Sequence, residues 1–226
     1  MENSNIVHKL QRDFGNGLTK QEMEDFTGAI QEFNKVIAIN PNIAEAYSNR
    51  GFSKQNIGDN HGALQDYNAA IKLDPAIAML VGYNRGVVHF VLGFYSEAIF
   101  DFNNVLNNDT SNFEAYCTRG SSKQCLGDLS GALQDFNKAI EINPNFGIAY
   151  YNRGNARYFL EDFQNAIQDY SLALGYLHNH PDIYYNRGNA KYNINDTNGA
   201  FLDWSEAYRL GKKEAFYLLN KYFNQL

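Results

Sequence analysis

Two stretches of this chain are nearly identical and lie 34 residues apart. Residues 150–158 read Tyr-Tyr-Asn-Arg-Gly-Asn-Ala-Arg-Tyr, and residues 184–192 read Tyr-Tyr-Asn-Arg-Gly-Asn-Ala-Lys-Tyr. Self-similarity at a fixed period between about 20 and 50 residues is typical of repeat architectures. Such a period overrides the usual expectation of one or two globular domains for a chain of 226 residues.

The glycine of this motif recurs along the whole chain, and two further columns follow it at fixed offsets. The glycines are Gly17, Gly51, Gly86, Gly120, Gly154 and Gly188. Alanine stands twelve residues later, at Ala29, Ala63, Ala98, Ala132, Ala166 and Ala200. An aromatic residue follows four further on, at Phe33, Tyr67, Phe102, Phe136, Tyr170 and Trp204. Steps of three and four residues are those of a helix face, so each unit is predicted to hold two helices.

Turn residues separate the two predicted helices of a unit. Gly58-Asp59 and Gly127-Asp128 stand between them, where glycine suits the end of one helix and aspartate caps the next. A glycine inside a helix costs about 1 kcal/mol against alanine, so the glycine column needs a compensating reason. We expect a close crossing of the two helices, with the alanine column as the small partner of the glycines.

The combined columns resemble the tetratricopeptide repeat family over about residues 10–226. The resemblance implies an all-α, right-handed superhelical solenoid of helix-turn-helix units, forming one array over residues 1–226. The units are predicted at about 10–43, 44–78, 79–112, 113–146, 147–180 and 181–214, with a capping helix at 215–226. The first unit is degenerate at Gly15-Asn16-Gly17, so its first helix is expected to be short or frayed. The third unit carries an extra residue near residues 76–78.

Two charged columns accompany the glycines. Arginine precedes the glycine in five units, at Arg50, Arg85, Arg119, Arg153 and Arg187. An acidic residue precedes each second-helix aromatic, at Glu32, Asp66, Asp101, Asp135, Asp169 and Asp203. Repeated arginine with repeated aspartate favours structural ion pairs, because the guanidinium fork matches a carboxylate. An anion-binding stripe is the alternative.

The first helices are expected to line the inner surface of the superhelix, as the family resemblance implies. Asparagine recurs there, and an amide can hold both groups of a peptide bond, as in the asparagine ladder of some family members. Hydrogen bonds within the repeat are the alternative role. The predicted backbone-binding residues are Asn49, Asn84, Asn152, Asn155, Asn186 and Asn189, and the predicted side-chain pockets are formed by Tyr83, Phe90, Tyr151, Tyr158 and Tyr185. A carboxylate clamp for acidic tails is disfavoured unless Lys54, Lys123 or Arg157 points inward.

Composition and motif searches exclude several function classes. The net charge of −6 argues against a nucleic-acid binder, and neither a signal peptide nor an apolar run of bilayer length is present. No catalytic, metal or cofactor motif occurs, and His178 with His180 reads as a polar loop before Pro181. Cys117 and Cys125, about 12 Å apart on one helix, are expected to be partly buried free thiols.

The sequence therefore predicts a non-catalytic, cytoplasmic adaptor that binds an extended, apolar or neutral peptide of a protein partner. It is predicted to need no cofactor and to be a monomer. Two alternatives stay open: an array that self-associates through its ends, and a regulatory part of a larger assembly.

Overall fold

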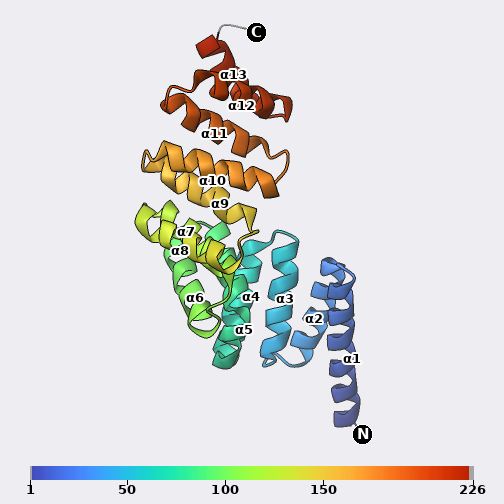
Figure 1. The fold of residues 1–226 in the computed structure, drawn as a ribbon. Coiled ribbons are helices and arrows are strands. Elements are labelled where there is room, and N and C mark those ends of the chain that lie inside the picture. Colours follow the sequence, from blue (N-terminus) through green and yellow to red (C-terminus); the bar gives the residue numbers. More distant parts are fainter. Residues whose placement is uncertain (1, 224–226) are drawn as a thin grey trace. The chain divides into compact units, whose positions relative to one another are not determined.

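The computed structural model describes residues 2–223, with side chains from residue 5, as a succession of α-helices joined by short turns (Figure 1). The helices are α1 (Glu2–Glu22), α2 (Phe26–Ile39), α3 (Ala44–Asn56), α4 (Asn60–Leu73), α5 (Ala78–Val91), α6 (Tyr95–Asn108), α7 (Phe113–Cys125), α8 (Leu129–Ile142), α9 (Gly147–Phe159), α10 (Phe163–Tyr176), α11 (Pro181–Asn193), α12 (Thr197–Arg209) and α13 (Lys213–Phe223). A single 3-10 turn, η1 (Pro75–Ile77), accommodates the extra residue of the third unit. Since the described residues contain no strand, the all-α prediction is confirmed.

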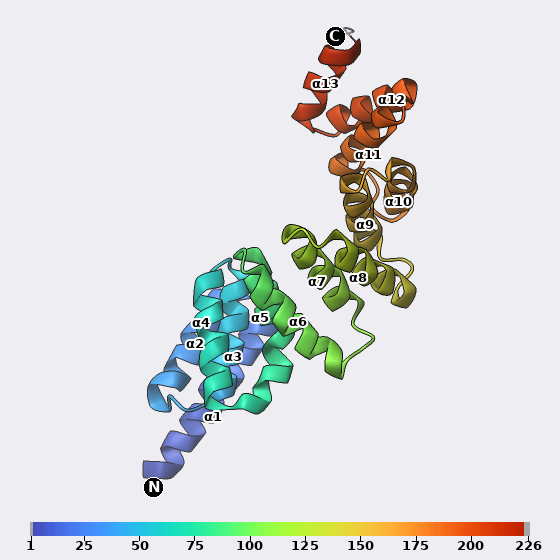
Figure 2. The ribbon, with the colours of Figure 1, turned by 90° about the vertical axis from the view of Figure 1, so that its left-hand side faces the viewer.

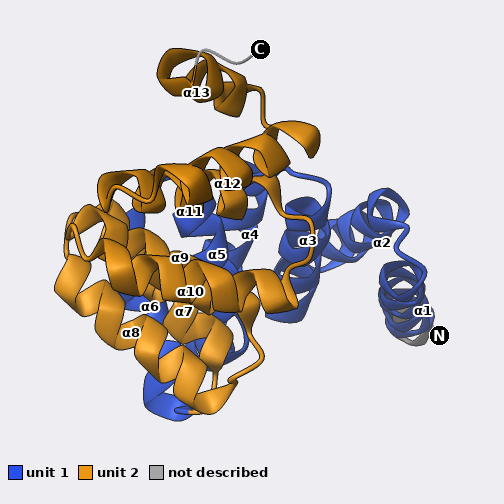
Figure 3. Cartoon of the chain, turned by 45° about the horizontal axis from the view of Figure 1, so that its top comes forward, with its two compact units in different colours: residues 1–110 blue, residues 111–226 orange. Residues whose placement is uncertain are grey.

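The chain divides into two compact units, residues 1–110 and 111–226, coloured separately in Figure 3. The first unit contains the helix pairs α1/α2, α3/α4 and α5/α6. The second contains α7/α8, α9/α10, α11/α12 and the final helix α13. Each pair is one repeat of the sequence, so we number the repeats 1 to 6 in chain order. The organisation of all six repeats as one array stays a prediction.

The turn inside a repeat is built as the sequence predicts. Gly58 and Gly127 have φ of +82° and +85°, in the left-handed region where glycine is not strained. The carboxylates of Asp59 and Asp128 then accept a hydrogen bond from the backbone N–H three residues on, which caps the second helix. Asp25 caps α2 in the same way.

The glycine column lets the aromatic ring of the second helix lie against the backbone of the first. A Cβ on Gly154 would stand 2.8 Å from Cε1 of Tyr170, closer than packed carbon atoms approach. The same ring contact occurs in every repeat, at Phe33, Tyr67, Phe102, Phe136 and Trp204. The expectation that alanine is the small partner of these glycines was wrong, because the aromatic ring fills that space. The alanines are fully buried elsewhere in the pair.

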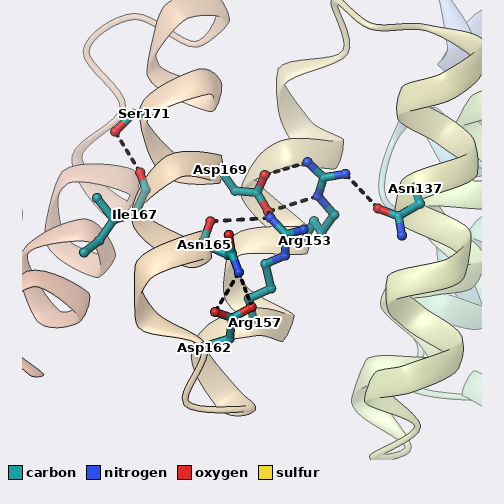
Figure 4. A network of polar contacts seen from close by, with 8 residues as sticks. All are labelled: Asn137, Arg153, Arg157, Asp162, Asn165, Ile167, Asp169 and Ser171. Carbon is teal, nitrogen blue, oxygen red and sulfur yellow. Dashed lines mark hydrogen bonds and ion pairs between the residues drawn. The ribbon is translucent and has the colours of Figure 1, made fainter. Parts of the chain in front are cut away.

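An ion pair between a half-buried arginine and a buried aspartate joins the two helices of repeats 2 to 6. In repeat 5, Arg153 donates from Nε and Nη2 to the two carboxylate oxygens of Asp169, at 3.0 and 2.6 Å (Figure 4). Nη1 of Arg153 donates to Oδ1 of Asn137 on α8, at 2.7 Å, so the same guanidinium reaches the preceding repeat. Arg157 adds a second cation to Asp169 at 2.7 Å. The corresponding pairs are Arg50–Asp66, Arg85–Asp101, Arg119–Asp135 and Arg187–Asp203. The structural interpretation of these columns is confirmed.

Helix α1 contradicts the expectation of a short or frayed first helix. It runs unbroken for 21 residues through the glycine pair at Gly15 and Gly17. Phe14 packs edge-on against Phe33 of α2, with ring centroids 5.6 Å apart, and Gly17 faces the same ring. Tertiary packing on α2 therefore outweighs the poor helix propensity of these glycines.

Helix α13 covers the end of repeat 6, as the capping prediction requires. It begins at Lys213, and Leu219, 2% exposed, packs in a cluster with Trp204 and Ala207. Tyr222 stacks on the Trp204 ring at a centroid distance of 6.0 Å. Phe216, predicted to cover the sixth unit, contacts Tyr208 but remains 40% exposed. The expected end of this helix, residues 224–226 with Leu226, lies outside the described residues.

Removal of the arginine from a repeat should destabilise the fold. We expect Arg153→Ala to lower the free energy of unfolding by about 3 kcal/mol, because it leaves the Asp169 carboxylate, 1% exposed, without its main partner. Urea denaturation measures this change. Arg209→Ala is the control, since its ion pair with Glu206 is exposed and its loss should leave the midpoint nearly unchanged. Equal midpoints for both variants would refute the structural role.

A methyl group on the packed glycine should also destabilise the helix pair. Gly154→Ala is expected to cost about 1 to 3 kcal/mol, because the buried Tyr170 ring has to move. Gly175→Ala, also in this repeat, is the matched control because no atom lies within 4 Å of its added Cβ. Its better helix propensity should stabilise the protein by up to about 1 kcal/mol. Thermal melting of the two variants should therefore shift in opposite directions.

Candidate peptide-binding surfaces

Each unit has a hollow on its first helices, where the sequence predicts the groove. In the first unit a hollow of about 220 Å³ lies between α3 and α5, and its lining includes Asn49, Phe52, Leu80 and Asn84. In the second unit a hollow of about 220 Å³ is lined by Gln124, Asn155, Tyr158, Phe159, Tyr170 and Asn186, from α7, α9, α10 and α11. We call these the α3–α5 hollow and the α9–α11 hollow. Helix α3 contacts α5 in the first unit, and α9 contacts α11 in the second unit.

The side-chain amides of the asparagines in the α3–α5 hollow make few hydrogen bonds within the protein. Asn49 donates from Nδ2 only to the carbonyl of Glu45, one turn earlier on its own helix, at 2.8 Å. The side-chain amide of Asn84 makes no hydrogen bond to the described residues, and this residue is half-buried. Phe52 and Leu80 beside them are 38% and 73% exposed. This hollow therefore combines available amides with accessible apolar side chains.

The asparagines of the second unit instead link neighbouring repeats. Asn152 donates to Oγ of Ser121 on α7 at 3.2 Å. Asn186 donates to Oδ1 of Asn155 at 3.0 Å and to the hydroxyl of Tyr151 at 3.3 Å, both on α9. The Oδ1 atoms of Asn152 and Asn186 accept no hydrogen bond from the described residues and are not buried. Their amide NH₂ groups are used by the array, while their carbonyl oxygens stay available.

Asn155 and Asn189 carry a role that sequence reasoning missed. Oδ1 of Asn155 accepts the hydroxyl of Tyr170 at 2.9 Å, and Oδ1 of Asn189 accepts Nε1–H of Trp204 at 3.0 Å. Burial raises the pKa of the Tyr170 hydroxyl, so it remains a neutral donor. A buried polar group of this kind requires a partner.

The sequence contained a signal for these bonds. Where the aromatic of the second helix carries a polar hydrogen, the first helix of that repeat supplies an amide oxygen. In repeat 2 this oxygen is Oε1 of Gln55, which accepts the hydroxyl of Tyr67 at 2.8 Å. The repeats with phenylalanine in this column have no such group to satisfy. Asn155 and Asn189 retain free Nδ2 atoms within the described residues, so both remain able to donate to a ligand.

The predicted aromatic pockets are half-buried against neighbouring rings. Tyr83 packs edge-on to Phe102, Phe90 contacts Tyr95, and Tyr151 contacts Tyr170. Tyr158 packs against Phe163, and the ammonium of Lys212 lies 5.5 Å from the centre of the Tyr185 ring. The more exposed ring beside the α9–α11 hollow is that of Phe159, which is 65% exposed.

No basic side chain lines either hollow. Lys54, Lys123 and Arg157, the column considered for a carboxylate clamp, bind the aspartates of their own repeats at 2.7–2.9 Å. Figure 4 shows Arg157 converging with Arg153 on the same carboxylate. These cations are therefore engaged in ion pairs within the fold.

The two cysteines differ more than the sequence suggests. Cys117 is 4% exposed, and burial raises the pKa of its thiol to about 12. Cys125 is exposed, so the expectation of two partly buried thiols was wrong for this residue. Both are free, and among the described residues no cluster of three or more His, Cys, Asp or Glu is placed to bind a metal ion. His180 stands at the N-cap position of α11 without a side-chain capping bond, and Pro181 is the first residue of the helix, as predicted for the loop.

Comparisons with known proteins agree with this architecture. Models of the tetratricopeptide repeat match residues 44–77 and 148–176, and a second TPR repeat model matches residues 126–160. The structure of pilF from Pseudomonas aeruginosa is 18% identical, with a TM-score of 0.75, over 96% of this chain and 99% of that chain. YrrB, described as a TPR protein with an unusual peptide-binding site, is 23% identical with a TM-score of 0.65, over 84% and 97%.

MamA from Desulfovibrio magneticus RS-1 is 17% identical with a TM-score of 0.70, over 74% of this chain and 94% of that chain. The comparison with curated proteins finds no match. Residues 44–77 and 126–176 thus match tetratricopeptide repeats and the chain has the TPR fold, which supports a scaffold for protein–protein interaction. No helix within residues 2–223 is long and apolar enough to cross a membrane.

The different environments of the two thiols predict different reactivities. At about pH 8 the disulfide reagent DTNB should modify Cys125 rapidly and Cys117 slowly, because the buried thiol remains protonated. Absorbance should record a fast phase of one equivalent, which Cys125→Ser abolishes and Cys117→Ser retains. Two equally fast equivalents in the native protein would contradict the burial of Cys117.

Proposed function

We propose that this protein is a non-catalytic adaptor whose first helices bind an extended, mostly apolar or neutral peptide segment of a protein partner. The observation that carries the proposal is the α9–α11 hollow, where Asn155 and Asn186 lie beside the rings of Tyr158 and Phe159. Amides supply both donors and acceptors for a peptide backbone, and aromatic rings supply area for its side chains.

The asparagines act in this proposal as fixed hydrogen-bonding groups. Asn186 is oriented by its two bonds to α9, so its Oδ1 needs no reordering before it accepts a backbone N–H. Asn155 is oriented by Tyr170 and keeps Nδ2 as a donor. Groups that are ordered in advance lose little entropy on binding, which favours affinity.

The charge of the residues that line the hollows is the reason for proposing a neutral peptide as the ligand. The hollows lack basic side chains, and Glu45 lines the α3–α5 hollow. An acidic peptide tail would meet no counter-charge there, while a neutral segment would lose little on desolvation. The likeness of the fold to YrrB, which is described as having a peptide-binding site, is in keeping with this proposal.

The asparagine column can be tested with selected peptides. We expect a random library of displayed 12-residue peptides to yield ligands whose contacts map by NMR to α9 and α11. The double variant Asn152→Ala, Asn186→Ala should weaken binding tenfold or more, equivalent to about 1.4 kcal/mol. It should also lose about 1 kcal/mol of stability for each lost cross-repeat bond, so circular dichroism must first establish that the variant is folded.

Asn165→Ala is the matched control for this experiment. Asn165 is an exposed asparagine of α10 whose amide donates only to Asp162, so its removal should leave affinity unchanged. Ligands that bind the folded double variant as tightly as the native chain would remove the asparagine column from the proposal. Ligands that map outside both hollows would refute the proposed site.

A further inference from the structure

Four repeats place a tyrosine beneath the arginine of the ion pair. The guanidinium carbon of Arg50, Arg119, Arg153 or Arg187 lies 5.3–5.5 Å from the centre of the tyrosine ring three residues earlier. These rings belong to Tyr47, Tyr116, Tyr150 and Tyr184. Repeat 3 has the same arginine, Arg85, but glycine at the tyrosine position, Gly82.

A pocket of about 230 Å³ occupies the place of the missing ring. It lies between α5 and α6, adjacent helices in Figures 1 and 2, and is lined by Met79, Gly82, Arg85, Asn104, Val105 and Asn108 among others. A Cβ built on Gly82 would meet only Cγ2 of Val105, at the ordinary contact distance of 3.4 Å. The pocket therefore starts at the helix backbone, and no side chain fills it.

In repeat 5 the position that corresponds to this pocket is occupied by a tyrosine ring. There the Tyr150 ring is 9% exposed and stacks on Tyr176, with centroids 5.9 Å apart and planes 21° apart. Tyr176 stands 22 residues after the repeat glycine, and the corresponding residue of repeat 3 is Asn108. The same position thus accepts a phenol ring between a guanidinium and the second helix.

The cation of the pocket is already held in place. Arg85 donates to both oxygens of Asp101 and, from Nη1, to Asn68 at 3.0 Å. Its guanidinium is thereby fixed as it is in the repeats where a ring covers it. An aromatic ring placed there gains a cation–π contact without any reordering of the arginine.

The pocket opens on a different face from the proposed peptide groove. Gly82 precedes Asn84 by two residues, which places them about 200° apart around α5. Met79 at the pocket is 67% exposed. A second hollow of about 340 Å³ shares Arg85 and includes Phe100, which is 62% exposed. Exposed apolar side chains around a ready-made ring site are typical of an interaction surface.

We propose that this pocket binds an aromatic side chain of a protein partner, with tyrosine as the best-fitting residue. The ring would stack beneath Arg85 as Tyr150 does beneath Arg153. The amides of Asn104 and Asn108 are the groups in the lining that can hydrogen-bond a phenol hydroxyl. This contact is a second binding site, separate from the groove of the first helices.

The test uses p-cresol, the side chain of tyrosine, as the probe and NMR of the full chain as the measurement. We expect saturable shifts of the Arg85 Nε–H and the Gly82 backbone N–H, because an aromatic ring current acts on both. The Nε–H of Arg50, already covered by Tyr47, should not move. Cyclohexanol, of similar size but not aromatic, should bind more weakly.

Variants of Gly82 distinguish a binding site for an aromatic ring from a surface that is only apolar. Gly82→Tyr should fill the pocket, abolish the p-cresol shifts and raise the melting temperature, as a native tyrosine does in the other repeats. Gly82→Ala adds helix propensity without a ring and should keep the p-cresol site. Conversely, Tyr47→Gly should create a second site, seen as new p-cresol shifts at Arg50.

Three results would overturn the proposal. They are the absence of a saturable p-cresol shift at Arg85 in the native chain, equal binding of cyclohexanol, and persistence of the shifts in Gly82→Tyr. The first two outcomes do not depend on any variant being folded.

Discussion

The arginine–aspartate pair is the contact on which the rest of each repeat depends. In repeat 5, Arg153 holds Asp169 across the helix pair, reaches Asn137 of the preceding repeat and covers the Tyr150 ring. One side chain thus links two helices, two repeats and an aromatic cluster. A buried ion pair adds little net stability over apolar packing, but loss of one partner is costly. Its repetition gives repeats 2 to 6 the same contact between their first and second helices.

In the second unit the asparagines of the first helices are used to build the array, and this limits what can serve recognition. Asn155 satisfies a buried tyrosine hydroxyl, and Asn186 satisfies Asn155. The groups that remain for a ligand are the amide atoms that make no hydrogen bond within the protein, together with exposed rings such as Phe159. The hydrogen-bonding groups of the proposed groove are also structural, which makes the two roles difficult to separate by mutation.

Departures from the repeat pattern give individual repeats their own properties. Gly82 replaces a tyrosine and leaves a pocket beside Arg85, although the rest of repeat 3 retains the ion pair. Repeats 2, 5 and 6 have a tyrosine or tryptophan at the aromatic position of the second helix. In each of them an amide oxygen of the first helix accepts the polar hydrogen of that residue, as in the Tyr67–Gln55 contact. In a solenoid each repeat contacts only its neighbours, so such local changes are tolerated without altering the fold.

The repeat pattern alone was enough to predict the helix pairs, their turns, the capping helix and the arginine–aspartate pairs. These features depend on local spacing and on residues that recur in every repeat. The packing of the helices was needed to show that rings, rather than alanines, pack on the glycines and that α1 is continuous. The packing also shows which half of each asparagine amide is free and that Cys125 is exposed. Such outcomes depend on how the side chains of neighbouring helices pack against each other. The spacing of residues along the sequence does not specify this packing.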